Sequence, residues 1–292
     1  MSTKILLWSV VVAGGLSFAC QTPAQPAPVN FPAASPLCTL KQRVGLTDIE
    51  IVYSRPGIKG RTVFGGIVPY DTVWRTGANM ATKVTFSTPV QLDGTDIPAG
   101  AYSLFTIPGT NQWTIIINKD ANQWGAFRYN SNDDLVRFTV TPQTLADTRL
   151  ETFTIEFNRI RDDSARLLLI WDKTVVPINL QVDLVHALVP QIKAAMAKPG
   201  KKSDGFYFQA ASFYYDHGLD LNQALEWVDA GLSDHPMIAF EMLHLKAQIL
   251  AKHGDKAAAI AAAKQSTALA IKAEGPANSF VWMNQQLISN LQ

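Results

Sequence analysis

The stretch Phe-Thr-Ile-Glu-Phe, residues 153–157, places an apolar side chain at every second position. Successive residues of a β-strand point to opposite faces of a sheet, so this period of two indicates a strand with one buried face. The same alternation recurs at residues 83–86 and 136–140. We therefore predict that the chain from Thr47 to about Asp183 is built of strands.

Turn residues join several of these predicted strands. Asp93-Gly94 follows residues 90–92, and Pro108-Gly109 precedes the apolar strand that begins at Trp113. Both dipeptides are typical of the short connections in β-hairpins. About nine or ten strands fit in this region, with no convincing helical segment between them. The predicted fold is an antiparallel β-sandwich over residues 39–185, with a closed barrel as the alternative.

From Leu184 onward the apolar residues recur with a helical period. Turn signals such as His217-Gly218 and His253-Gly254 leave room for about six helices. The region also matches itself at an offset of about 35 residues, which superposes Ala224 on Ala259. The pattern resembles a tetratricopeptide repeat at Phe208, Ala211, Ser212, Tyr215, Ala224, Val228, Gly231 and Pro236. We predict a tetratricopeptide-like domain of α-helical hairpins over residues 186–292, which docks a protein partner or braces the sandwich.

The N-terminal residues carry an export signal. Lys4 precedes an apolar run from Ile5 to Ala19, which is shorter than the roughly 20 residues that a bilayer-spanning helix needs. We predict a signal peptide over residues 1–19 and a tether rich in Pro and Ala over residues 20–38. Cys20 follows a loose lipobox, so we expect a lipid-anchored protein of the periplasm or outer membrane, with plain secretion as the alternative. In an oxidising compartment, Cys38 is a lone thiol if Cys20 is acylated, and otherwise the two cysteines can pair.

Composition excludes several classes of function. Residues with apolar side chains make up 47% of the 292 residues, so the chain can bury a core and is not intrinsically disordered. The 25 Lys and Arg residues are balanced by 24 Asp and Glu residues, which argues against a nucleic-acid partner. Membrane contact is expected only through a lipid on Cys20.

The predicted sandwich contains no histidine, because all five histidines follow residue 185. Catalytic triads, Cys-His pairs and typical zinc sites all need imidazole or thiolate groups. We therefore expect neither a metal site nor a cofactor. The doublets Asp133-Asp134 and Asp162-Asp163 are interpreted as solvated turns.

Basic and aromatic residues are concentrated in one part of the predicted sandwich. Between Lys41 and Lys83 there are seven basic residues and three acidic ones. Arginine and aromatic side chains together can bind carboxylates, phosphates or sugar rings. The candidate ligand-binding residues are Arg55, Lys59, Arg61, Tyr70, Trp74, Arg75, Asn79, Ser103 and Trp124. In the alternative interpretation, Trp74 belongs to the core, and Arg55 and Arg75 donate to backbone carbonyls.

The same part of the chain resembles a known family. The motifs are Ser54-Arg55-Pro56, Lys59-Gly60-Arg61, Phe64-Gly65-Gly66, Val68-Pro69-Tyr70 and Trp74-Arg75-Thr76-Gly77-Ala78-Asn79, followed by Pro98-Ala99-Gly100, Tyr102-Ser103-Leu104-Phe105, Trp113, Asn118-Lys119 and Trp124-Gly125. Together they resemble the bacterial domain-of-unknown-function 2911 family over residues 47–182. The resemblance implies an exported protein with a helical tail, and it implies no particular reaction.

Three functions remain open from the sequence. The first is a module that binds a small polar or anionic ligand without turnover. The second is an envelope hydrolase that uses a carboxylate, for which Asp71, Asp120 or Asp172 would have to converge on the basic cluster. The third is a structural scaffold without a small-molecule ligand.

The N-terminal predictions can be tested by intact mass spectrometry of the native protein. We expect a mass that corresponds to cleavage before Cys20 plus a diacylglycerol and an acyl chain. Cys20→Ser should remove that added mass. An unmodified chain with a Cys20–Cys38 disulfide would instead indicate plain secretion.

Overall fold

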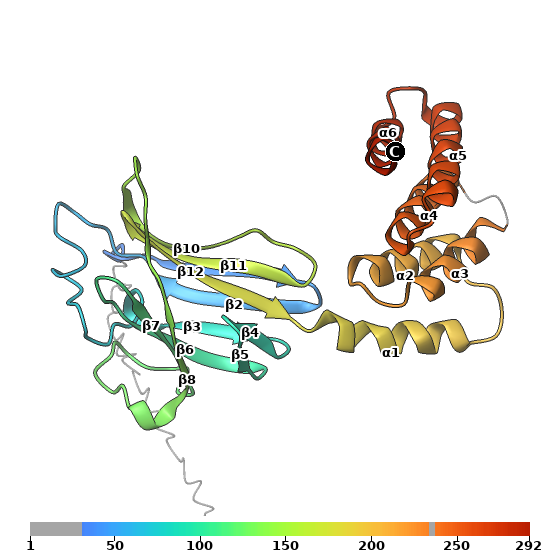
Figure 1. Ribbon diagram of the computed structural model, residues 1–292. Helices are drawn as coiled ribbons and strands as arrows, with labels where there is room; N and C mark the ends of the chain where they lie inside the picture. Colours follow the sequence, from blue (N-terminus) through green and yellow to red (C-terminus); the bar gives the residue numbers. More distant parts are fainter. Residues whose placement is uncertain (1–30, 234–236) are drawn as a thin grey trace, which may run out of the picture.

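The computed structural model describes residues 31–233 and 237–292. It consists of a β domain followed by helices that lie beyond one end of it (Figure 1). The predicted signal peptide, Cys20 and the turn at His235-Pro236 lie outside the described residues.

Six antiparallel strands form the first sheet, in the order β1-β2-β3-β6-β7-β8. They are β1 (Leu37–Val44), β2 (Thr47–Ser54), β3 (Ala78–Phe86), β6 (Gly100–Ile107), β7 (Trp113–Asn118) and β8 (Asp134–Val140). The strand region thus starts at Leu37, before the alternation that the sequence shows from Thr47. As an edge strand, β1 buries only its last residue, Val44, which explains its weak apolar pattern.

The second sheet has the order β10-β11-β12-β4-β5, and β9 also pairs with β12. Its strands are β4 (Val90–Leu92), β5 (Thr95–Ile97), β9 (Gln143–Thr144), β10 (Leu150–Asn158), β11 (Ser164–Asp172) and β12 (Thr174–Val182). The β4–β5 hairpin crosses from the first sheet to the second, and the chain then returns so that β6 pairs with β3. This arrangement confirms the predicted antiparallel sandwich.

The inner faces of the two sheets share one apolar core. Val84, Phe86, Phe153 and Ile155 are buried in it, as their alternation predicted. An aromatic cluster closes the core beneath residues 55–77, here called the 55–77 loop, at the end of the sandwich away from the helices (Figure 1). Trp74 lies at the centre of this cluster, with ring centroids 5.2 to 6.3 Å from those of Phe64, Trp113, Phe153 and Trp171.

The described part of the chain contains six α-helices after the sandwich. They are α1 (Leu184–Ala197), α2 (Asp204–Asp216), α3 (Leu221–Leu232), α4 (Ala239–His253), α5 (Lys256–Glu274) and α6 (Ser279–Leu291). Helix α2 packs on α3, α4 packs on α5, and α6 packs on both α5 and α4. The small residues Ala224, Ala259 and Ala263 are fully buried, so they allow close contact between helices. Gly231 has the same role, because a Cβ there would collide with Met242 of α4.

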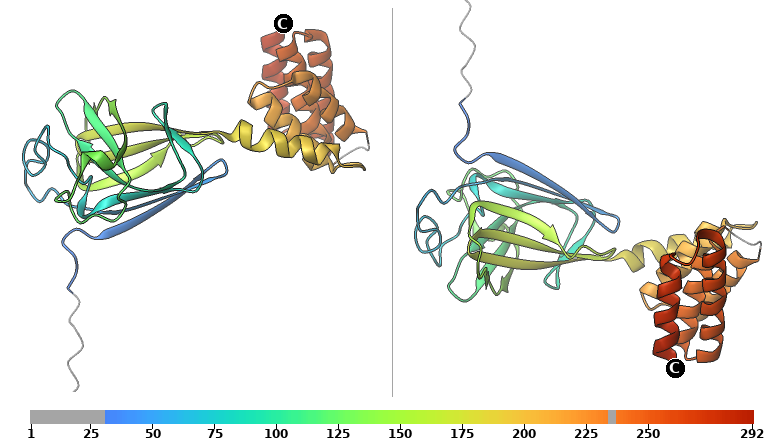
Figure 2. Two further views of the ribbon diagram at one scale, coloured as in Figure 1. Left: turned by 90° about the horizontal axis from the view of Figure 1, so that it is seen from below. Right: turned by 90° about the horizontal axis from the view of Figure 1, so that it is seen from above.

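The helices extend away from the sandwich, and α1 forms the connection (Figure 2). A polar contact also joins the two domains, because Nε2 of His217 lies 3.0 Å from Oδ2 of Asp162. The aromatic residues of α2 pack within the helical stack, where the rings of Tyr214 and Trp227 are 4.6 Å apart. These side chains therefore contact the helical stack rather than the sandwich, so they do not serve the bracing role that the sequence left open. Within the described residues, no helix has both the length and the apolar character needed to cross a bilayer.

The aromatic cluster generates a prediction of stability. Trp74→Ala should lower the free energy of unfolding of the β domain by about 3 to 5 kcal/mol, because it leaves a cavity in the core. Trp282→Ala is the control, since the Trp282 side chain is 64% exposed, and it should change stability by less than about 0.5 kcal/mol. Urea unfolding followed by far-UV circular dichroism measures both. Equal effects of the two substitutions would contradict this role of Trp74.

Candidate functional site

Two of the predicted cationic residues bind the backbone of the sandwich. Nε of Arg55 donates to the Phe153 carbonyl at 3.1 Å, and Nη2 donates to the Thr154 hydroxyl at 2.7 Å. Arg61 donates to the carbonyls of Ile58 and Gly57 at 2.9 and 2.7 Å. These contacts match the alternative interpretation for Arg55, and they also hold the 55–77 loop in place.

Three other predicted residues lie on the surface around this loop. The backbone N–H of Lys59 donates to a carboxylate oxygen of Glu151, and the Lys59 residue itself is exposed. Tyr70 is 40% exposed, and its ring packs where a side chain on Gly65 would otherwise lie. Asn79 donates to the Ser35 carbonyl and the Ser54 hydroxyl at 3.2 and 3.1 Å. These side chains belong to separate local contacts and do not form one pocket.

Trp74 and Arg75 point to opposite faces of the first sheet. Trp74 pairs with Thr106 of β6 and lies in the core, where its indole N–H donates to the Gly77 carbonyl at 3.1 Å. Because facing residues alternate, this register places Arg75 beside Phe105 on the outer face. Thr76 follows with a φ of 53°, a conformation that β-branched residues rarely adopt, and the chain turns there. The sequence predicted that both residues bind a ligand, but only Arg75 lies outside the core.

The outer face of the first sheet carries its own small apolar cluster. Ala81, Phe105 and Ile116 are buried there, and Val73 and Tyr129 pack against them. The cover comes from residues 119–130, here called the 119–130 connection, which joins β7 to β8. Ser103 lies on the same face and is fully buried, with its hydroxyl donating to the Asp120 carbonyl at 2.7 Å. Ser103 is therefore part of the packing beneath this cover.

Gln123 connects the cover to the sheet. Its side chain is 4% exposed, and its Nε2 donates to Oδ1 of Asn118 at 2.8 Å. The Gln123 carbonyl accepts from the N–H of Ala81, and the N–H of Gly125 donates to the Asn79 carbonyl. The two segments thus form a short antiparallel ribbon in which Gln123 faces Ala81 and Trp124 faces Met80. Met80 and Trp124 point away from the sheet and are 40% and 61% exposed.

A charged network lies beside Gln123 and was missed by the sequence interpretation. The Asp134 carboxylate accepts from Asn118 at 2.8 Å, from the Tyr129 hydroxyl at 2.6 Å and from Nε of Arg137 at 2.7 Å. The Asp134 side chain is only 8% exposed, so the prediction that Asp133-Asp134 is a solvated turn is wrong for Asp134. Burial, followed by the hydrogen bond to Asp134, raises the pKa of Tyr129 to about 12. The adjacent aspartates in the sequence did not predict this buried network, because the partners of Asp134 come from β7, the 119–130 connection and β8.

Two buried polar atoms on this face have no hydrogen-bond partner among the described residues: Nε of Arg75 and Oε1 of Gln123. The Arg75 guanidinium also has no carboxylate partner there, and partial burial lowers its pKa. The backbone on either side of these two atoms contacts β3. The Thr82 N–H donates to the Arg75 carbonyl, and the Ala81 N–H donates to the Gln123 carbonyl. The unpaired donor and the unpaired acceptor therefore both belong to segments that contact β3.

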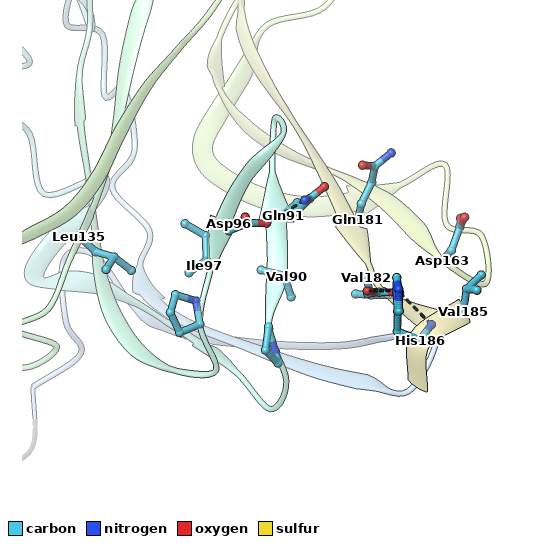
Figure 3. A pocket seen from close by; sticks show the side chains of 13 residues that line it. Val90, Gln91, Asp96, Ile97, Leu135, Asp163, Gln181, Val182, Val185 and His186 are labelled. Carbon is cyan, nitrogen blue, oxygen red and sulfur yellow. Dashed lines mark hydrogen bonds and ion pairs between the residues drawn. The ribbon is translucent and has the colours of Figure 1, made fainter. Parts of the chain in front are cut away.

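A cavity of about 780 Å³ lies at the opposite end of the sandwich, between the β4–β5 hairpin and the start of α1 (Figure 3). Val90, Ile97 and Val182 form its apolar part. Its three carboxylates already have partners, since Asp183 binds His186 at 2.6 Å, Asp96 accepts from Gln91 at 2.8 Å and Asp163 accepts from Ser164 at 2.8 Å. None of the predicted site residues lines this cavity or the three others described in this part of the chain.

The carboxylates that a hydrolase would need do not converge. Asp172 pairs with Arg149 at 2.5 Å at the end of β11, and Asp120 accepts from the N–H of Asn122 in the 119–130 connection. Asp71 lies in the 55–77 loop, where its N–H donates to the Pro108 carbonyl. In the described residues, no three His, Cys, Asp or Glu side chains are grouped as a metal site would require. Cys38 is present there as a free thiol.

Comparison with known proteins gives one match. A family model described as "Protein of unknown function (DUF2911)" matches residues 35–180, which is half of the chain. No curated protein and no solved structure matches the chain. The matched residues include the 55–77 loop, the 119–130 connection and both sheets up to the last two residues of β12.

The Asp134 network predicts an unusual tyrosine titration. An absorbance titration at alkaline pH should contain one phenol that ionises at about pH 12, and Tyr129→Phe should remove it. Because the folded protein holds this proton more tightly than the unfolded chain, the stabilisation is complete below about pH 10 and is lost as the pH rises toward 12. Between these values, stability should therefore fall less steeply in Tyr129→Phe. A component of unchanged size near pH 12 in the variant would contradict the assignment.

Proposed function

The chain belongs to the DUF2911 family, and we propose that its β domain binds a small anionic ligand on behalf of an exported, lipid-tethered envelope protein. The observation that carries the proposal is the buried Nε of Arg75, which has no hydrogen-bond partner among the described residues. A charge that is partly removed from water without a counter-ion costs free energy, and an anionic ligand would offset this cost. A carboxylate or a phosphate suits the planar donor set of arginine best.

Gln123 supports a more specific class of ligand. Its Oε1 is a buried acceptor without a partner, and Nε of Arg75 is a buried donor without a partner. A hydroxyl group can donate to the first atom and accept from the second. We therefore favour a ligand that carries hydroxyl groups beside its acidic group, such as a sugar acid or a sugar phosphate.

The proposed binding differs from the nine-residue cluster that the sequence suggested. Arg55 and Arg61 are already bound to carbonyls, and Trp74 and Ser103 are buried. Binding through Arg75 leaves these residues with a positioning role, because they hold the 55–77 loop and the outer face in shape. Lys59, Tyr70 and Asn79 remain surface residues at the same end of the sandwich.

Export and tethering rest on the N-terminal sequence. The apolar run of residues 5–19, the cysteine at position 20 and the Pro-rich segment that follows support a lipoprotein signal and a spacer. In this proposal the helical region is a tail for protein interaction rather than a brace. Its extension away from the sandwich in Figure 2 supports that role.

Thermal unfolding with a panel of anions tests the proposal. The probes are inorganic phosphate, gluconate and glucose 6-phosphate, with glucose as the uncharged control. We expect gluconate or glucose 6-phosphate to raise the Tm of the wild type and glucose to leave it unchanged. Arg75→Met should weaken this binding about 10- to 100-fold, because it removes a charge-assisted hydrogen bond worth about 1.5 to 3 kcal/mol.

The stability of the ligand-free variants separates binding from scaffolding. Arg75→Met should leave the Tm unchanged or raise it, because it removes a partly desolvated charge that has no partner. Arg128→Ala is the matched control, since Arg128 is an exposed arginine of the neighbouring connection, and it should retain ligand binding. If no anion stabilises the wild type and Arg75→Met lowers the Tm, Arg75 is a structural residue and the proposal is wrong.

A further inference from the structure

We propose that the β domain lies directly on a lipid bilayer, and that the exposed side chains of Met80, Trp124 and Phe127 insert into it. These three residues are here called the Trp124 patch. The proposal rests on the export and tethering proposed above, and it adds a surface and a partner that the tether alone does not specify.

The ribbon geometry creates the patch. Because Ala81 donates to Gln123 and Gly125 donates to Asn79, Met80 and Trp124 form a non-hydrogen-bonded pair. Facing side chains lie closest together in such pairs. Phe127 follows three residues after Trp124 in the same connection, and its ring lies where a side chain on Gly125 would be. The inward side of the same ribbon, Ala81 and Gln123, packs on the sheet, so the patch is held on a well-supported element.

The patch is apolar and uncovered within the described residues. Met80 is 40% exposed, Trp124 is 61% exposed and Phe127 is 87% exposed. Single exposed apolar residues are ordinary, but a facing pair on a ribbon with a third exposed ring in the same connection is typical of an interaction surface. Trp and Phe are also well suited to the boundary between headgroups and acyl chains, where amphipathic interfacial surfaces insert.

The position of the N-terminal segment identifies the partner as a membrane. The Ser35 carbonyl accepts from the side chain of Asn79, the residue before Met80, and the Pro36 carbonyl accepts from the N–H of Arg55. The chain from Cys20 therefore reaches the sandwich beside the patch. Eleven residue steps separate Cys20 from Phe31, and a fully extended chain of that length spans at most about 40 Å. A lipid on Cys20 would thus keep the patch close to the bilayer that holds the lipid.

Charge around the patch favours an anionic bilayer. Arg128 and Lys119 are exposed at the two ends of the connection that carries Trp124 and Phe127, and Asp120 is the acidic residue in that connection. Basic side chains near a membrane surface are attracted to anionic headgroups. Lys119 and Arg128 thus bracket the apolar residues of the connection in the sequence.

Vesicle co-sedimentation tests the proposal. The protein is the full mature chain with Cys20→Ser, so that no lipid anchor contributes, and the vesicles contain phosphatidylethanolamine and phosphatidylglycerol. We expect binding that weakens about tenfold or more in the double variant Trp124→Ala/Phe127→Ala, because two apolar insertions are lost. The matched control is Met237→Ala/Trp282→Ala in the helical region, where the residues are 97% and 64% exposed, and it should bind like the parent.

The outcomes separate this proposal from the tether. If native Cys20 carries a lipid but the Cys20→Ser chain does not bind vesicles, the patch proposal is wrong and the tether stands. If native Cys20 carries no lipid and binding still depends on Trp124 and Phe127, the patch stands and the tether is wrong. Circular dichroism confirms that the double variant is folded. Self-association without vesicles that the double variant abolishes would overturn the proposal, because the patch would then bind a second copy of the chain.

Discussion

The burial of Trp74 is the interaction on which the rest of the described β domain depends. Its indole ring packs against Phe64, Phe153 and Trp171, and its N–H is satisfied by the Gly77 carbonyl. A tryptophan contributes most when its large apolar ring is buried and its polar atom is bonded, and both conditions hold here. Because the chain alternates on either side of Trp74, the same burial fixes Arg75 on the outer face. One core contact therefore closes the sandwich and positions the candidate ligand-binding cation.

The outer face of the first sheet is unusual because it is covered by a polar connection. Ser103 and Asn118 are fully buried on a face that a two-layer sandwich would normally expose to water. Buried polar groups need hydrogen-bond partners, and the 119–130 connection supplies most of them through Asp120 and Gln123. The cover thus holds the sheet and the connection in one arrangement. The 119–130 connection turns the unpaired Oε1 of Gln123 toward the sheet and exposes Trp124 on its outer side.

These two sides give the connection two proposed roles that do not interfere. A hydroxyl-bearing anion would use the buried donor of Arg75, and its hydroxyl group would donate to the buried acceptor of Gln123. Contact with a bilayer would use apolar rings on the opposite side of the same ribbon. The cavity near α1 belongs to neither role, because its carboxylates are already paired with His186, Gln91 and Ser164. Each proposed surface includes one residue of this cover, Gln123 or Trp124, and the N-terminal segment contacts Asn79 beside Met80.

Periodicity alone determined the architecture of this protein. An alternation such as that of residues 153–157 can be satisfied only by a strand with one buried face, and the small residues of α3 and α5 imply close helix contacts. Turn chemistry likewise placed the hairpins at Asp93-Gly94 and Pro108-Gly109. Tertiary structure alone decided which polar side chains lack a hydrogen-bond partner among the described residues. Arg55 and Arg75 look equivalent in the sequence, but strand register gives Arg55 the carbonyl of Phe153, nearly a hundred residues away, and leaves Arg75 without a partner. Hydrogen bonds between distant segments depend on which strands become neighbours, and a local sequence pattern does not specify strand pairing.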